Sequence, residues 1–193
     1  MIDSGAYIKD GIQSIAKQGV CPEVVFLGMT KPEAIWSYNI SKFTIKPSLA
    51  SYDFGKKNKS VVYYRVLQTL IQIKQALIKG FPIVFGFQVY ESFERIGLDG
   101  IMHLPRFSEK LLGGHAVLMV GFDDNIVIDG IKGAFIVRNS WGPNWGDKGY
   151  FYMPYSYATN PIRANDFWTV TQVQRTTREL ILNDVDNLEE ITL

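Results

Sequence analysis

Five short segments in the second half of the chain most constrain its fold. They are rich in β-branched and aromatic residues, and Gly, Asp, Asn and Pro separate them, which is typical of strands joined by turns. They are residues 83–90, 115–122, 133–141, 149–155 and 166–173. We expect an antiparallel sheet or a small barrel. Because two amphipathic helices are expected before them, at 3–19 and 67–79, the predicted class is α+β.

The first predicted helix has recognisable ends. Asp3 or Ser4 can cap its N-terminus and Gly19 can end it. Its apolar residues are spaced to lie on one buried face: Ile8, Ile12 and Ile15. Residues 20–60 are expected to be irregular, with a solvated basic turn near Lys56.

The composition excludes several classes of partner. The chain has 193 residues, 47% of them hydrophobic, which suffices for a core, and a net charge of +1, which gives no attraction to nucleic acid or anionic membrane. No apolar run approaches the roughly 18 residues of a transmembrane helix, and the polar start MIDSGAYIKDG does not read as a secretory signal. The single cysteine fits a reducing compartment, but secreted domains with few cysteines also occur, so the localisation stays open.

One of the two histidines lies in a sequence context that favours catalysis. His115 follows Gly113 and Gly114 and opens an apolar predicted strand, as an active-site base can do. Asn139 ends a later strand, and its amide oxygen could accept from Nδ1–H of the histidine and orient the ring. An indole at Trp141 could then shield the pair from water. The other histidine, His103, is read as a surface or packing residue.

These motifs resemble the histidine and asparagine blocks of papain-like cysteine peptidases. The blocks are GGHAVLMVGFDD (113–124) and IVRNSWGPNWGDKGYFYMPY (136–155). DSGAYIKDGIQSIAKQGVCPE (3–23), IWSYNISKF (35–43) and NDFWTV (165–170) are similar to further blocks of the branch found in bacteria and large DNA viruses. The resemblance implies a papain-like fold, mostly its right-lobe antiparallel sheet or barrel plus one left-lobe helix.

The resemblance also implies roles for single residues. His115 would be the base and Asn139 its orienting amide, while Trp141 and Trp145 would support the pair. Substrate contacts would come from either side of the cleft: Ser4, Gly5, Gly114 and Ala116. The implied substrate is a peptide or protein. No cofactor is implied, and the few histidines and one cysteine give no metal-ligand spacing.

The only cysteine, Cys21, does not match the nucleophile of this family. If Gln18 and Gly19 are aligned with the family's Gln-Gly-x-Cys-Gly-Ser-Cys-Trp block, the nucleophile position falls on Val24. A predicted helix also leads into Cys21, whereas a nucleophilic cysteine begins one. We therefore expect Cys21 to be a small, partly buried apolar residue. The nucleophile and the oxyanion glutamine are then expected to be missing from this chain.

The predicted organisation follows from this alignment. Residues 1–60 would be a remnant of the helical left lobe with an atypical loop at 22–35. Residues 61–173 would be the right-lobe domain, and 174–193 a tail that is either an amphipathic helix or disordered. We expect the C-terminal part of a thiol endopeptidase, inactive alone, whose partner is a missing N-terminal half. The alternatives are a non-catalytic peptide-binding or complementing module and a decayed fragment.

Overall fold

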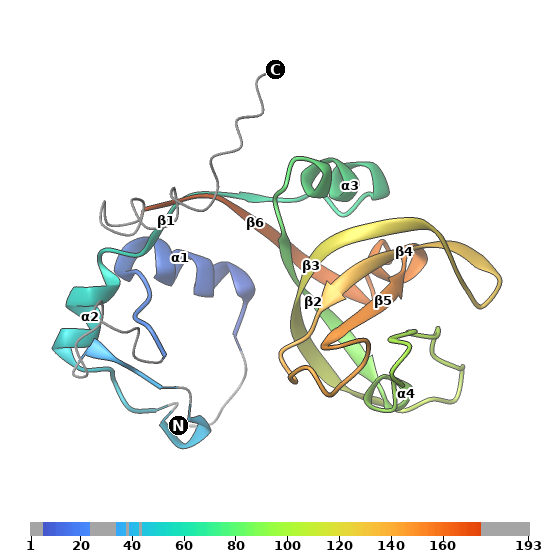
Figure 1. Ribbon diagram of the computed structural model, residues 1–193, viewed down its shortest axis with the longest axis horizontal. Helices are drawn as coiled ribbons and strands as arrows, with labels where there is room; N and C mark the ends of the chain where they lie inside the picture. Colours follow the sequence, from blue (N-terminus) through green and yellow to red (C-terminus); the bar gives the residue numbers. More distant parts are fainter. Residues whose placement is uncertain (1–5, 24–33, 38, 43, 175–193) are drawn as a thin grey trace. The chain divides into compact units, whose positions relative to one another are not determined.

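The computed structural model describes residues 6–23, 34–37, 39–42 and 44–174 (Figure 1). Ser4, Gly5, most of the loop at 22–35 and the tail after residue 174 lie outside the described residues. The backbone contacts divide the chain into two compact units. The first contains residues 10–62 with residues 6 and 171–174, and the second contains 7–9 and 63–170. The assignment of 1–60 and 61–173 to two lobes of the family stays a prediction.

A six-stranded sheet confirms the predicted α+β class (Figure 1). Its strands are β1 (Lys59–Arg65), β2 (Ile83–Tyr90), β3 (Leu111–Ile128), β4 (Ile131–Arg138), β5 (Tyr150–Pro154) and β6 (Ala164–Gln174). They are arranged in the order β1-β6-β2-β3-β4-β5, and the pairs β2–β3, β2–β6, β3–β4 and β4–β5 are antiparallel. The five strands expected from the sequence are β2 to β6.

Alternation along β2 places the hydrophobic core on one face of the sheet. Ile83, Phe85, Phe87 and Val89 are buried in turn, as the two-residue period of a strand requires. Helix α3 (Leu70–Ile78), which begins at the N-cap Thr69, adds the fully buried Ile73 to this core. The short helices α4 (Glu91–Glu94) and α5 (Tyr155–Ala158) follow β2 and β5.

Helix α1 spans Ile8–Gln18, so the described helix starts later than the predicted residue 3. The acceptor at its start comes from β6, where Asp166 Oδ2 accepts from the backbone N–H of Ile8 at 2.8 Å. Gly19, with φ +77°, ends the helix as predicted. Ile12 is buried, but Ile8 is only half-buried and Ile15 is 36% exposed, so the prediction that all three isoleucines are buried holds for Ile12 alone.

The expectation that 20–60 is irregular is also wrong in part. Helix α2 (Leu49–Gly55) forms because the Ser48 side chain accepts from Ser51 N–H at its first turn. A 3-10 turn, η2 (Ile40–Lys42), and the start of β1 also lie in this region. Lys56 follows α2 and pairs with Asp53 at the surface, in line with the predicted solvated turn. No helix among the described residues combines the length and the hydropathy needed to cross a bilayer.

Candidate active site

His115 lies inside strand β3, not at its mouth. The strand begins at Leu111, so Gly113 and Gly114 are strand residues, and His115 is paired with Phe87 of β2. The prediction that His115 opens the strand is therefore wrong. Because the flanking strand β2 holds this stretch on one side and β4 pairs with it further on, the backbone of His115 sits in a rigid setting.

Asn139 immediately follows β4 and is held in place by its own backbone, because its N–H donates to Gly149 O at 2.9 Å. Its side chain is buried, at 7% exposure. Asn139 Oδ1 lies 2.8 Å from His115 Nε2. The predicted pairing of these two side chains is present, but through Nε2 of the ring and not through the expected Nδ1.

The orientation of this amide determines which ring nitrogen carries a proton. Ser140 N–H donates to Asn139 Oδ1 at 2.8 Å, and a backbone N–H can only donate, so the atom facing it must be the oxygen. That oxygen can only accept from His115, so Nε2 is the protonated nitrogen. In the neutral ring Nδ1 is then left with its lone pair, which is what a general base requires.

An aromatic group surrounds the ring of His115. Trp141 stacks on it, with 5.2 Å between ring centroids and 27° between planes, and Trp145 lies edge-on to Trp141 at 5.1 Å. Phe93 of α4 contacts both indoles and lies 6.4 Å from the imidazole. We call Phe87, Phe93, Trp141, Trp145 and Phe151 the aromatic group. Phe87, Phe93 and Trp141 contact the imidazole directly, and Trp141, 43% exposed, forms the part of this group that reaches solvent.

The sequence pointed to Trp141 and Trp145 but not to Phe93. The Phe93 side chain is 2% exposed and is carried by a helix of one turn, Glu91–Glu94. Its neighbours in the sequence have no apolar period that could be read as a helix. Only the packing against residues far along the chain reveals its place beside His115.

Glycines in the loop between Asn139 and Tyr150 permit a close backbone approach. A Cβ at Gly146 would lie 2.4 Å from Tyr150 O, and the residue has φ +57°. Gly146 thus lies against the backbone at the start of β5, and the Asn139 N–H bond to Gly149 O closes the loop that carries Asn139 and Trp141.

The predicted substrate-contacting residues are placed only in part. Gly114 and Ala116 flank His115 in β3 and are exposed. Ala116 is paired with Gly86, which is paired on its other side with Asn165 of β6. Ser4 and Gly5 lie outside the described residues. The contact of all four with substrate stays a prediction.

Cys21 and His103 are placed as the sequence suggested. Cys21 is half-buried and follows the C-terminal end of α1. His103 is exposed, and its Nδ1 lies 2.7 Å from Asp129 Oδ1. The Leu104 N–H and then His103 hold the pKa of Asp129 below its ordinary value of 3.8. Within the described residues no three potential metal ligands cluster.

Comparison with known proteins agrees with this architecture. The model of the papain family cysteine proteases matches residues 5–167. An uncharacterized peptidase C1-like protein, L477 of Acanthamoeba polyphaga mimivirus, is 41% identical over 95% of this chain and 56% of its own length. Xylellain, a cysteine protease from Xylella fastidiosa, is 39% identical, with a TM-score of 0.71 over 90% of this chain and 63% of that one.

The six-stranded sheet with its adjoining helices is an α+β domain, and the paired imidazole and amide lie on it. The match over most of its length shows that the chain belongs to the papain family of cysteine proteases. A cathepsin B-like protein of Giardia intestinalis, CP3, is 41% identical over 41% of this chain and 24% of its own length. The chain spans between about half and two thirds of the mimivirus relative and of xylellain.

Proposed function

We propose that His115 is the general base and acid of a thiol peptidase, that Asn139 orients it, and that the thiolate comes from residues outside this chain. The observation that carries the proposal is the hydrogen bond between Asn139 Oδ1 and His115 Nε2. It leaves Nδ1 as the nitrogen that can exchange a proton with a reactant.

The chemistry would be acyl transfer in two halves. Nδ1 takes the proton of a thiol, the sulfur attacks the peptide carbonyl carbon, and the proton then passes from Nδ1 to the departing amine. A thioester remains. Water attacks it as Nδ1 takes a proton from the water, and the proton returns to sulfur when the carboxylic acid leaves. Throughout both halves Asn139 keeps Nε2–H engaged, which stabilises the imidazolium that forms.

The local structure of Cys21 argues against its being the thiol in this scheme. Cys21 comes just after the last turn of α1, which ends at Gln18. The C-terminal end of a helix carries partial negative charge and disfavours a thiolate, whereas an activated cysteine sits at a helix N-terminus. Since Cys21 is the only cysteine in the sequence, the nucleophile of the proposed reaction has to be supplied by another segment.

The proposed substrate is a peptide or protein. An exposed strand segment on either side of His115, with the small residues Gly114 and Ala116, leaves room for an extended chain to approach the base. The family resemblance implies that Ser4 and Gly5 would also contact the substrate backbone.

A chimera tests the proposal. The part of xylellain that this chain does not match would be fused ahead of residue 1, and hydrolysis of a fluorogenic peptide and labelling by a thiol-reactive epoxide would be measured. We expect turnover and labelling, and His115→Ala should lower kcat by about a thousandfold or more. Cys21→Ser and His103→Ala are the matched controls and should retain activity. The unfused chain should hydrolyse nothing.

A folded chimera that labels with the epoxide but keeps its turnover in His115→Ala would remove His115 from the proposed role. A chimera that folds yet neither labels nor hydrolyses any peptide would favour the non-catalytic binding module. Circular dichroism of each variant separates these results from misfolding.

A further inference from the structure

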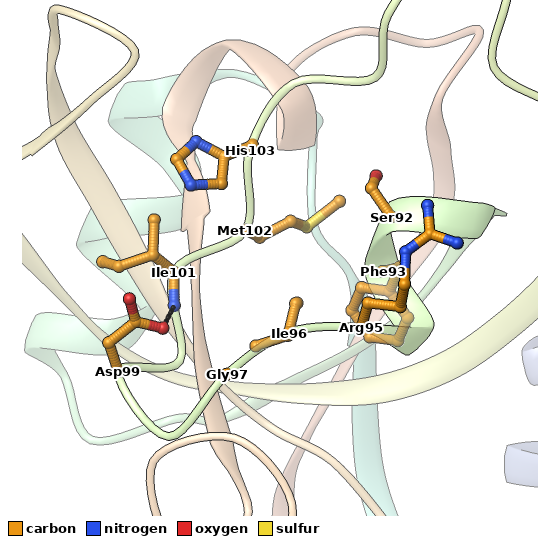
Figure 2. A pocket seen from close by; sticks show the side chains of 9 residues that line it. All are labelled: Ser92, Phe93, Arg95, Ile96, Gly97, Asp99, Ile101, Met102 and His103. Carbon is orange, nitrogen blue, oxygen red and sulfur yellow. Dashed lines mark hydrogen bonds between the residues drawn. The ribbon is translucent and has the colours of Figure 1, made fainter.

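A small pocket lies beside the aromatic group, between α4 and the segment that follows it (Figure 2). Its volume is about 170 Å³, and its apolar lining includes Phe93, Ile96 and Met102. A cavity of roughly 150 Å³ accommodates a benzene ring, so one ring or one large side chain matches this space.

Charged side chains lie around the mouth of the pocket. In Figure 2, Arg95 lies on the right of the pocket, and His103 and Asp99 lie on the left, with Met102 between Arg95 and His103. The side chain of Arg95 is exposed, and among the described residues no carboxylate oxygen lies within 4.0 Å of its guanidinium. Asp99 is already engaged, since its Oδ1 accepts from Ile101 N–H at 3.2 Å.

Two further sets of interactions hold side chains near the pocket in place. Asp129 pairs with His103 through Nδ1, which fixes the orientation of the imidazole that lines the pocket. Glu109, on the segment between the pocket and β3, accepts from the backbone N–H groups of Ser92 and Arg106. Glu109 also feels the charge of Arg95, but among the described residues no hydrogen bond or ion pair within 4.0 Å engages the Arg95 guanidinium. Its N–H groups can therefore donate to an added anion.

The inner wall of the pocket is also a wall of the candidate active site. Phe93 lines the pocket and packs edge-on against Trp141, with 5.4 Å between ring centroids, and at a tilt against Trp145 at 5.2 Å. Trp141 in turn stacks on His115. A ligand that presses on Phe93 therefore acts on the packing around the imidazole through a single intervening ring, because close-packed interiors transmit displacement.

We propose that this pocket binds a small apolar group bearing a carboxylate, and that its occupancy is felt at His115 through Phe93. The apolar body would lie against Phe93, Ile96 and Met102, and the carboxylate would accept from Arg95. A free aromatic acid and the C-terminal residue of a peptide both have this chemistry. The binding itself does not depend on the proposed peptidase function.

The two histidines make the test direct, because the ring Cε1–H signals of the chain are only those of His103 and His115. The unfused chain is titrated with phenylacetate, and the signals are assigned with His103→Gln. We expect saturable shifts of both signals with one common Kd, in the range of about 1–10 mM for a ligand of this size. Phenylacetamide, which lacks the charge, should bind at least about tenfold more weakly.

Arg95→Gln should weaken phenylacetate binding at least about tenfold, since it removes a charge-assisted hydrogen bond. Arg106→Gln is the matched control, because Arg106 is an exposed arginine on the neighbouring loop outside the pocket lining, and its Kd should stay within about twofold of the unchanged chain. Acetyl-Ala-Ala-Phe and its C-terminal amide distinguish the two sources of ligand. If the peptide with a free carboxylate binds and its amide does not, the C-terminus of a peptide is an acceptable ligand. If neither peptide binds, the ligand is a free aromatic acid such as phenylacetate.

The proposal is overturned if phenylacetate causes no saturable shift of His103, or if Arg95→Gln binds it as tightly as the unchanged chain. A shift confined to His103, with the His115 signal fixed at saturation, would overturn the coupling through Phe93.

Discussion

Asp166 of β6 accepts a hydrogen bond from the first residue of α1, Ile8, although 158 positions of sequence separate them. The same carboxylate accepts from the indole N–H of Trp168 through its other oxygen, at 2.5 Å. Asp166 has φ +57°, a left-handed backbone conformation that Asp and Asn tolerate better than most residues. A side chain near the end of the described chain thus acts as the N-terminal acceptor for its first helix.

Replacing this acceptor should destabilise the chain. Asp166→Ala removes the hydrogen bonds from Ile8, Lys9 and Trp168. It also places alanine at a positive φ, where no side-chain oxygen offsets the backbone strain, so we expect the free energy of unfolding to fall by about 1–3 kcal/mol. Asp166→Asn keeps an acceptor and tolerates the backbone, and should lose less than half as much. Urea unfolding followed by circular dichroism measures both. Equal stability of Asp166→Ala and the unchanged chain would contradict the assignment.

The loop that carries Asn139 gives a second, internally controlled prediction. Gly142 and Gly146 both have positive φ, but a Cβ at Gly142 has no neighbour within 4 Å, whereas one at Gly146 would clash with Tyr150 O. Gly142→Ala should cost about 1–2 kcal/mol of unfolding free energy from backbone strain alone. Gly146→Ala should cost clearly more, because backbone must also move. Similar midpoints in urea for the two variants would show that the close approach does not limit stability.

The orientation of His115 can be read directly in solution. Long-range ¹H–¹⁵N spectra of the neutral ring should show the proton on Nε2, because Asn139 Oδ1 accepts there. Asn139→Ala should yield a mixture of both tautomers at His115 and leave the tautomer of His103 unchanged. A pure Nδ1–H form of His115 in the unchanged chain would contradict the hydrogen bond on which the proposed mechanism depends.

The stability of the β3–β4 turn should depend on acidity through Asp129. Since Leu104 N–H and then His103 lower the pKa of this carboxyl from 3.8, the unfolded chain takes up the proton more readily than the folded chain. The stabilisation is therefore present above about pH 4 and is lost as the pH falls through the lower folded value. Asp129→Asn, which tolerates the positive φ of this residue, should remove it.

Urea unfolding from pH 7 to 3 measures this difference, in a His103→Gln background so that the imidazole does not titrate. The gap in unfolding free energy between this background and the same chain carrying Asp129→Asn should be constant above about pH 5 and shrink below about pH 4. Asp53→Asn, at an exposed ion pair, is the control and should show no such gap. A gap that widens toward acid would reverse the expected sign.

Strands were easier to predict here than helix boundaries and side-chain environments. The β-branched and aromatic residues at 83–90 predicted both ends of β2, Ile83–Tyr90. Burial of every second residue produces an alternating pattern that can be recognised in the sequence of the strand itself. The start of α1 could not be predicted from its neighbours, because its acceptor, Asp166, belongs to another strand. Helix α2 was missed because its seven residues are too few to display a helical period.

The candidate site was predictable as a set of residues but not as a geometry. His115, Asn139 and Trp141 were found from glycine and tryptophan spacing, yet the ring nitrogen involved was predicted as Nδ1 and is Nε2. Ring orientation depends on the twist of β3 against the loop after β4, which no local pattern encodes. Phe93 shows the same limit, as its importance comes only from what it packs against.

The hydrogen bond from Ser140 N–H to Asn139 Oδ1 also has a kinetic consequence. Asn139 Oδ1 accepts from both Ser140 N–H and His115 Nε2–H, and the Asn139 N–H is bonded to Gly149 O, so the amide and the imidazole are already oriented when a thiol arrives. A segment that supplies the thiol would therefore meet a preorganised proton acceptor, His115 Nδ1. The conformational entropy of orienting the imidazole would already have been lost on folding and would not add to the barrier of the reaction.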